Sequence, residues 1–258
     1  MASAADLAKL RTPPPDFGRV TVRSIDALTP HLRRVVLGGD ALDGFEIESP
    51  AASVRILVPE PGADELVLPE WQGNEFRYAD GERPSIRTFT PRSFDPEGLE
   101  LTIDVVEHSG GVVSSWARAA SPGDQAAFSG PGRGFALDPE TSGYLLAGDE
   151  TALPAIAQLV EWIPDDVPIR AIVEVRDGDA RLLGLDDAPH VEVDWVLTGD
   201  ERGSEVLDRL GAAEIDGGTA VWVAGEAAVM HAVRSLLRDE RGIERARMTV
   251  RGYWKDRR

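Results

Sequence analysis

The chain has 258 residues, of which 42% are hydrophobic and 28% charged, as expected for a folded protein with one large domain or two smaller ones. Its 27 basic and 45 acidic residues give a formal net charge of −18, which argues against nonspecific binding to nucleic acid or to anionic lipid. The absence of cysteine excludes disulfides, thiol catalysis and cysteine-ligated zinc or iron–sulfur clusters within the chain. The four histidines show no metal-binding spacing. Since no signal-peptide run and no stretch of membrane-spanning length occurs, we expect a cytoplasmic protein without membrane insertion.

Short apolar runs, punctuated by glycine and proline, predict strands in the first half of the chain. Residues 53–58 alternate between apolar and polar types, and residues 99–106 repeat apolar side chains at a period of two. A single helical pattern covers about residues 112–119. After a loose lead-in over residues 1–16, these patterns predict a small antiparallel β-barrel over residues 17–138.

The second half alternates strands with helices. Strands are expected at residues 144–147, 169–175, 191–197, 219–224 and 248–250, and helices at 151–162, 203–210 and 226–238. This order predicts a doubly wound parallel sheet over residues 139–258. The glycine-rich segment 130–135 is interpreted as the corner between the two domains.

The hexapeptide that begins at Arg87 combines cations, an aromatic ring and two hydroxyls in a strand-like run. On a strand, Arg87 and Phe89 share one face while Thr88 and Thr90 share the other. Arg87 and Arg92 could make charge-assisted contacts to a pyrophosphate, and the ring could contact a flavin. Taken alone, the hexapeptide is explained better by an ordinary exposed strand with a buried phenylalanine.

A glycine pair precedes the helical pattern in the segment 108–116. The free N–H groups of a helix N-terminus bind anions, so a pyrophosphate is expected near Gly111 to Ser114. A plain turn at the two glycines is the alternative, and His108 alone indicates no ligand.

Two further turns join a strand to a helix in the second half. The first, at Gly148 and Asp149, lies at the carboxyl edge of the predicted parallel sheet, where open α/β folds bind ligands. Its carboxylates would repel a pyrophosphate, so a dinucleotide would need N–H groups and a cation, for which Arg176 is the candidate. The second turn, at Gly225 and Glu226, is explained equally well by a bound nucleotide and by simple helix capping.

With these motifs in this order, the chain closely resembles the siderophore-interacting proteins, FAD-dependent ferric-siderophore reductases of the ferredoxin-reductase-like superfamily. The segments that carry the resemblance are Arg87-Thr88-Phe89-Thr90, residues 108–116, Gly148-Asp149-Glu150-Thr151-Ala152-Leu153-Pro154, Ala224-Gly225-Glu226 and Gly252-Tyr253-Trp254. They span most of the chain, and the second-half Gly-Asp-Glu-Thr stretch and the terminal Gly-Tyr-Trp are the most specific.

The resemblance implies a flavin barrel followed by a nicotinamide-binding α/β domain. The expected FAD residues are Arg87, Thr88, Phe89, Thr90, Asp104, Val106, His108, Gly111, Val113 and Ser114, with Thr151 and Trp254 near the isoalloxazine; Asp149, Arg176, Gly225 and Glu226 are the expected nucleotide residues. Phe89 stands where the family usually has tyrosine, so ring stacking is retained and a phenolic hydrogen bond is lost.

The activity implied by the resemblance is electron transfer from NADH or NADPH, or alternatively from ferredoxin, through FAD to ferric iron in a siderophore. Beyond positioning of the flavin, no catalytic residue is required. Because ferric chelates such as catecholates are anionic, their binding to a chain of net charge −18 requires a local basic pocket, which we expect from Arg55, Arg133 and Lys255. We expect the protein to act as a monomer.

Two other functions remain open at this point. One is a flavin reductase or the reductase of an oxygenase, although typical members of that group carry a cysteine where this chain has Glu226. The other is a non-enzymatic protein that captures ferric chelates without redox turnover.

Overall fold

The computed structural model describes residues 14–63, 65–108, 111–179, 184–199 and 201–256. The chain divides into two compact units, Met1–Phe135 and Ala136–Arg258, and the boundary predicted at residues 138 and 139 lies slightly later. Most of the predicted lead-in over residues 1–16, and the first glycine of the pair before the predicted helix, lie outside the described residues. Among the described residues, no helix combines the length and the apolar character needed to span a membrane.

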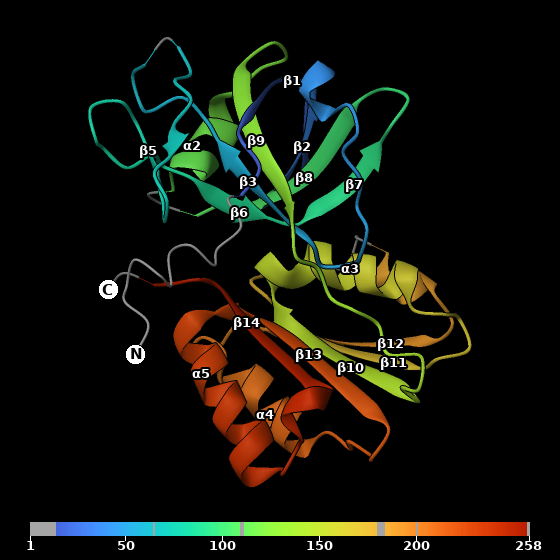
Figure 1. The fold of residues 1–258 in the computed structure, drawn as a ribbon. Helices are drawn as coiled ribbons and strands as arrows, with labels where there is room; N and C mark the ends of the chain where they lie inside the picture. Colours follow the sequence, from blue (N-terminus) through green and yellow to red (C-terminus); the bar gives the residue numbers. More distant parts are fainter. Residues whose placement is uncertain (1–13, 64, 109–110, 180–183, 200, 257–258) are drawn as a thin grey trace, which may run out of the picture. The chain divides into compact units, whose positions relative to one another are not determined.

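The first unit is built on a seven-stranded antiparallel sheet with the order β6-β3-β9-β1-β2-β8-β7 (Figure 1). Its strands are β1 (Gly18–Thr29), β2 (Leu32–Gly38), β3 (Ser53–Leu57), β6 (Arg87–Phe89), β7 (Pro91–Asp95), β8 (Glu100–Val106) and β9 (Gln125–Gly132). A small pair, β4 (Glu70–Trp71) and β5 (Phe76–Arg77), and the α-helix α2 (Val112–Ala119) complete the described part of the unit. The two edge strands, β6 and β7, are consecutive in the chain and only Thr90 separates them. The sheet must therefore curl until its edges meet, which is the closure expected of a small barrel.

Alternation along the strands fills the interior of this unit. Val54 and Ile56 on β3 are completely buried, as are Leu101 and Ile103 on β8, so the two strands read from the sequence are confirmed. Phe45 closes the core through edge-to-face contact with Phe94 and with Phe128, at centroid distances of 5.0 and 5.7 Å. Helix α2, which the sequence predicts at residues 112–119, has those bounds in the structure.

Strands β4, β5 and β9 were not predicted from the sequence, and β9 contradicts a stated interpretation. Residues 125–132 form β9, which pairs with β1 on one side and β3 on the other, whereas the sequence interpretation placed a corner at residues 130–135. That interpretation was wrong for Gly130–Gly132 because glycine and proline were taken as the end of regular structure. At Gly130 the small residue serves close packing, since a Cβ would lie 3.1 Å from the Val54 side chain.

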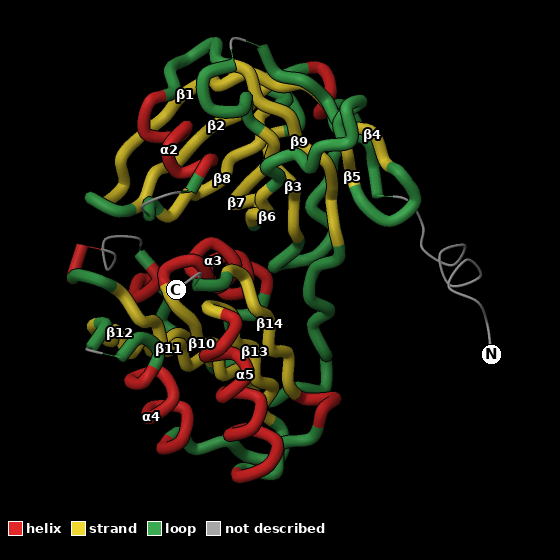
Figure 2. The backbone as a smooth tube through the Cα atoms, turned by 90° about the vertical axis from the view of Figure 1, so that its left-hand side faces the viewer, coloured by secondary structure: helices red, strands yellow, loops and turns green. Residues whose placement is uncertain are grey.

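The second unit is a five-stranded parallel sheet with the order β12-β11-β10-β13-β14. Its strands are β10 (Gly143–Asp149), β11 (Ile169–Val175), β12 (Val191–Leu197), β13 (Thr219–Glu226) and β14 (Met248–Trp254), and its helices are α3 (Leu153–Trp162), α4 (Ser204–Ala212) and α5 (Ala227–Ser235). Helix α3 covers one face of the sheet while α4 and α5 cover the other (Figures 1 and 2). The predicted doubly wound sheet is confirmed, and the chain reverses its winding between β10 and β13.

Glycine at position 148 is required by the close approach of β10 to β13. A Cβ there would collide with the carbonyl oxygen of Ala224 and would lie 2.5 Å from the Cβ of Ala152. We predict that Gly148→Ala lowers the free energy of unfolding by about 1–3 kcal/mol, because backbone must move to admit the methyl group. Thermal or urea unfolding measures the loss. Gly217→Ala is the matched control, since nothing lies within 4 Å of a Cβ at Gly217, and equal unfolding curves for the two variants would contradict the prediction.

Candidate functional site

The hexapeptide segment lies at the edge of the first sheet. Arg87 pairs with Ile56 and Phe89 with Val54, so both face the side of the sheet that carries the core, and Thr88 pairs with Arg55 on the other side. Arg87 is exposed, and its Nη1 donates to the carbonyl oxygen of Ile86 at 2.9 Å. Among the described strands, β6 pairs only with β3, so the backbone groups of its other edge are not part of the strand ladder. Thr90 follows this strand and is 6% exposed, so its side chain belongs to the interior.

The segment before α2 is tied to the first turn of that helix. The hydroxyl of Ser114 accepts the N–H of His108 at 3.0 Å and donates to the carbonyl oxygen of His108 at 3.1 Å. A Cβ at position 111 would lie 2.5 Å from two atoms of the His108 ring, so a larger residue there requires that side chain to shift. The Ser114 hydroxyl therefore holds the backbone in place and is already satisfied.

The N-terminus of α2 keeps its backbone donors. The first bond within the helix runs from the N–H of Ser115 to the carbonyl oxygen of Gly111, at 2.8 Å, so the preceding N–H groups have no partner in the helix. No side chain of the described residues caps the helix, and its first turn contains no acidic residue. This end of α2 has the chemistry of an anion site. Val113 is 2% exposed, so it could contribute only its backbone.

Glu107 anchors α2 to the sheet. Its carboxylate pairs with Arg33 on β2 and accepts from Nε of Arg118 on α2 at 2.9 Å. Burial raises the pKa of Glu107, but the hydrogen bonds and charges of Arg118 and Arg33 outweigh it, and the pKa lies below its usual value.

The Asp104 side chain is likewise committed to the structure. Its two carboxylate oxygens accept from Nε and Nη2 of Arg34, both at 2.8 Å, in a bidentate pair between β8 and β2. Val106, the last residue of β8, pairs with Leu32. Cofactor roles for Asp104 and Val106 stay predictions, and in this arrangement Asp104 could reach a ligand only through its backbone.

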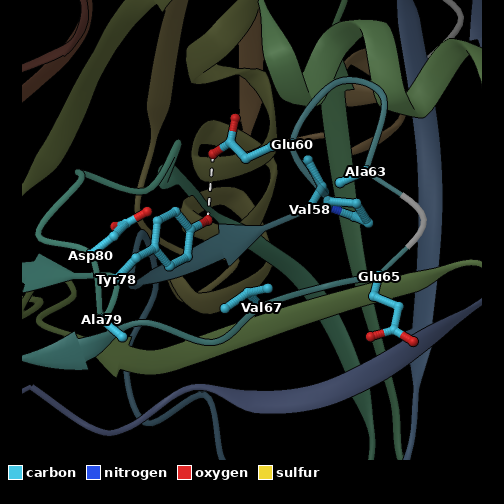
Figure 3. Close-up of a pocket in the computed structure, with 9 residues that line it drawn as sticks. Val58, Glu60, Ala63, Glu65, Val67, Tyr78, Ala79 and Asp80 are labelled. Carbon is cyan, nitrogen blue, oxygen red and sulfur yellow. Dashed lines mark hydrogen bonds between the residues drawn. The ribbon is translucent and has the colours of Figure 1, made fainter.

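Two of the pockets formed by the described residues of the first unit bear on the site. One, of about 300 Å³, has apolar walls from Val58, Val67 and Tyr78 and carries the carboxylates of Glu60, Glu65 and Asp80 (Figure 3). Burial, with the nearby Glu60 carboxylate, raises the pKa of Tyr78 to about 12. These acidic side chains suit neither a phosphate nor an anionic chelate.

The second cavity, of about 460 Å³, lies beside the start of α2. It is lined by Pro59–Ala63, by Val112, Ser115 and Trp116 on one side of α2, and by Gly123–Gln125. Its volume falls within the range of small-molecule sites, and the indole of Trp116 offers a surface for a planar ring.

At the carboxyl edge of the second sheet, Asp149 accepts four hydrogen bonds. One oxygen accepts the N–H and the hydroxyl of Thr151, at 2.9 and 2.5 Å. The other accepts the N–H of Glu226 at 3.1 Å and the indole N–H of Trp254 at 2.8 Å. Thr151, Trp254 and the turn at Gly225 are thereby brought together around one carboxylate. The repulsion expected from Asp149 toward a phosphate is therefore reduced, because its charge is already matched by donors.

Arg176 is engaged by Glu150. Its backbone N–H donates to one carboxylate oxygen at 2.8 Å and its Nε to the other at 2.7 Å. The sequence predicts Arg176 as a cation for a pyrophosphate. In that role its guanidinium would have to leave the Glu150 carboxylate or bind the carboxylate and the phosphate together.

Glu226 caps α5. Its Oε2 accepts the N–H groups of Ala228 and Val229, and its Oε1 accepts the N–H of Asp256 at 3.2 Å. Burial raises the pKa of Glu226, but these backbone hydrogen bonds outweigh it, so the pKa lies below its usual value. Of the two explanations left open for this turn, the structure shows helix capping, and a nucleotide role for Glu226 stays a prediction.

Sequence reasoning missed two residues at the same edge. Glu174, at the end of β11, is 3% exposed and accepts the N–H of Gly203 at 2.8 Å. Burial raises its pKa above the usual value, and the charge of Asp149 acts in the same direction. Arg202 lies over the Trp254 ring, with its Cζ 4.9 Å from the centroid. A carboxylate between two valines at the end of a predicted strand was the sequence signal that could have identified Glu174.

The three cations expected to bind the substrate are divided between the units. Arg55 on β3 is half-buried and pairs with Ser129 of β9, while the exposed Arg133 directly follows β9. Ser53, the first residue of β3, pairs with Gly132, so Arg133 follows β9 beside the start of β3, whereas Arg55 lies in the middle of that strand. Lys255 is exposed and follows β14 in the second unit. Within the described ranges, no three His, Cys, Asp or Glu side chains are grouped closely enough to hold a metal ion.

Comparison with known proteins identifies both units. Residues 21–135 match the model of the siderophore-interacting FAD-binding domain, and residues 141–257 match that of the siderophore-interacting protein. The chain is 31% identical to the NADPH-dependent ferric-chelate reductase of Escherichia coli (strain K12), over 92% of each chain. It is 28% identical to the ferric vibriobactin reductase ViuB of Vibrio cholerae, over 87% of this chain and 84% of that one. A siderophore utilization protein from T. fusca superposes with a TM-score of 0.84 at 34% identity, covering 96% of each chain.

The Glu107 ion pairs predict a pH-dependent contribution to stability. A carboxyl with a lowered folded-state pKa stabilises the protein above its unfolded pKa and ceases to do so as the pH falls through the folded value. We predict that Glu107→Gln lowers the free energy of unfolding by about 1–3 kcal/mol at neutral pH. The difference from the unsubstituted protein should shrink as the pH falls below about 4.

Urea unfolding at a series of pH values measures this difference. Glu97→Gln, at an exposed carboxylate in the turn between β7 and β8, is the matched control. A loss that is independent of pH would show that the Glu107 charge is not what stabilises the contact.

Proposed function

The chain belongs to the siderophore-interacting protein family, and from that premise we propose that it is an FAD-dependent reductase of ferric siderophores. In this proposal NADPH or NADH supplies the electrons, and Fe(II) is released in the cytoplasm. The observation that carries the proposal is the uncapped N-terminus of α2 in the unit whose edge strand carries Arg87. These are the donors and the cation that a dinucleotide pyrophosphate needs.

The residues of the first unit fit FAD. The N–H groups at the start of α2, which no described side chain caps, would bind the pyrophosphate, and Arg87 would add a charge-assisted contact. The cavity beside Trp116 would take the adenosine part. The backbone edge of β6 would hydrogen-bond the polar rim of the isoalloxazine, with Phe89 and Thr88 close to the ring system.

FAD, when bound, supplies the exchange between two-electron hydride transfer and one-electron reduction of ferric iron. The protein's own residues need to hold the electron donor, the flavin and the chelate in place and to exclude other reactants from the flavin. Fe(II) binds hard oxygen ligands less tightly than Fe(III), so reduction favours release from the chelate. No side chain is required to donate or remove a proton.

For the second unit we propose the nicotinamide donor. The carboxyl edge around Asp149 is the expected ligand edge of a doubly wound sheet, and the E. coli relative is described as NADPH-dependent. NADH and ferredoxin are the alternative donors. We propose that Arg55, Arg133 and Lys255 attract the anionic ferric chelate.

We predict that Arg87→Gln weakens FAD binding about 10- to 100-fold, the effect of losing a hydrogen bond to a charged group. FAD fluorescence titration of the apoprotein measures the affinity. Arg23→Gln, at an exposed arginine on β1, is the matched control and should bind like the unsubstituted protein. Should the unsubstituted protein be colourless and ignore added FAD, the proposal would be wrong.

The choice of acceptor and donor is tested by anaerobic reduction of a panel of ferric chelates with NADPH, NADH and reduced ferredoxin. We predict that Arg55→Glu and Lys255→Glu each weaken the binding of anionic chelates about tenfold, because the interaction is Coulombic. The binding of neutral chelates should change much less. Arg23→Glu is the control for the added negative charge. Equal losses for both chelate classes would exclude the basic clamp.

The same panel distinguishes the rival functions. Rapid reduction of free flavin or of an oxygenase partner, with slow reduction of every chelate, would favour a flavin reductase or the reductase of an oxygenase. Tight chelate binding without any Fe(II) in a chromogenic trap would favour a non-enzymatic binder.

A further inference from the structure

A hydrogen bond that lies in the plane of the ring fixes the indole of Trp254. Its Nε1–H donates to the Asp149 oxygen that also accepts the N–H of Glu226, at 2.8 and 3.1 Å. Glycine at position 225 allows this approach, since a Cβ there would lie 2.9 Å from the same oxygen. The indole is therefore held by a carboxylate that two other strand ends position.

One face of the same ring is covered by a cation. The guanidinium of Arg202 lies over it, 4.9 Å from the centroid, and the next residue, Gly203, is held by the buried Glu174 through its N–H. Trp254 is still half-buried rather than enclosed. The edge of the sheet thus presents an aromatic surface with a fixed orientation.

Only a carboxylate satisfies this arrangement. Asp149 receives four donors, two on each oxygen, and an amide has one acceptor oxygen and an NH₂ group that would face two donors. An isosteric amide would therefore place its NH₂ group against donors, and it would lose the hydrogen bonds either from Thr151 or from Glu226 and Trp254.

We propose that Asp149 is a positioning residue for the electron donor: through its bond to Nε1 it holds Trp254 as the surface against which the planar nicotinamide ring stacks. The inference rests on the proposed reductase function. The carboxyl edge of the sheet is where such a ligand binds, and stacking on an aromatic ring depends on ring orientation. A displacement of about 1 Å in such a surface changes a transfer rate by roughly a hundredfold.

The test is a double-mutant cycle with Asp149→Asn, Trp254→Phe and the double variant. Stopped-flow spectroscopy under anaerobic conditions measures reduction of bound FAD by saturating NADPH and NADH. Each single variant should slow this step about 10- to 100-fold. The double variant should be no slower than the slower single one, because both substitutions break the same contact.

Three measurements separate positioning from general damage. FAD content and reduction of the bound FAD by dithionite should remain as in the unsubstituted protein, because neither depends on a nicotinamide. Asp208→Asn and Trp162→Phe, at exposed positions on α4 and α3, are the matched controls and should leave the rate unchanged. If Asp149→Asn melts below the assay temperature, Trp254→Phe carries the test alone.

Unchanged rates in the single variants, or rate losses that multiply in the double variant, would overturn the inference while leaving the reductase function intact. A protein that holds FAD but takes no electrons from either nicotinamide would remove this inference, and the reductase function would then require ferredoxin as the donor.

Discussion

The Asp149 carboxylate is the interaction on which the second unit's candidate site depends. It joins the end of β10 to the turn at Gly225 and to the last residue of β14, and it also caps the turn that leads into α3 through Thr151. These segments can surround one carboxylate only if the strands approach closely, which is why glycine is required at 148 and favoured at 225. The same requirement fixes the place of Trp254, so the geometry of the ligand edge follows from one side chain and its donors.

A chain of net charge −18 that binds anionic ligands must keep its carboxylates from repelling them. Several carboxylates of the two units are occupied by structural partners: Glu107 and Asp104 by arginines, Glu226 by backbone N–H groups, and Glu150 by Arg176. Each of these carboxylates is thus part of the structural frame, and no side chain of the described residues caps the backbone donors at the start of α2. The excess of negative charge therefore does not contradict the proposed cofactor.

Patterns that are local in the sequence predicted the structure well. The bounds of α2 and β11, and the strand–glycine–helix turns, depend on periodicity and on single residues, and they are confirmed. What the sequence could not supply are contacts between distant positions. Asp149 meets residues 77 and 105 positions further along the chain, and no spacing rule indicates which of its neighbours donates to it. Strand β9 was missed for a related reason: its glycine and proline are tolerated because β3 packs tightly against it.

The alternation of β-strands also suggests how one edge of the first sheet could serve two anionic ligands. Arg87 lies on the side of β6 that carries Val54 and Ile56 on the neighbouring strand, and Arg55 lies on the opposite side. A cofactor phosphate held by Arg87 and a chelate held by Arg55 would then be separated by the sheet itself, and neither would compete for the other's cation. On this account, reversing the charge of Arg55 changes chelate binding and leaves FAD affinity nearly unaffected, whereas a single shared basic pocket would make the two affinities fall together.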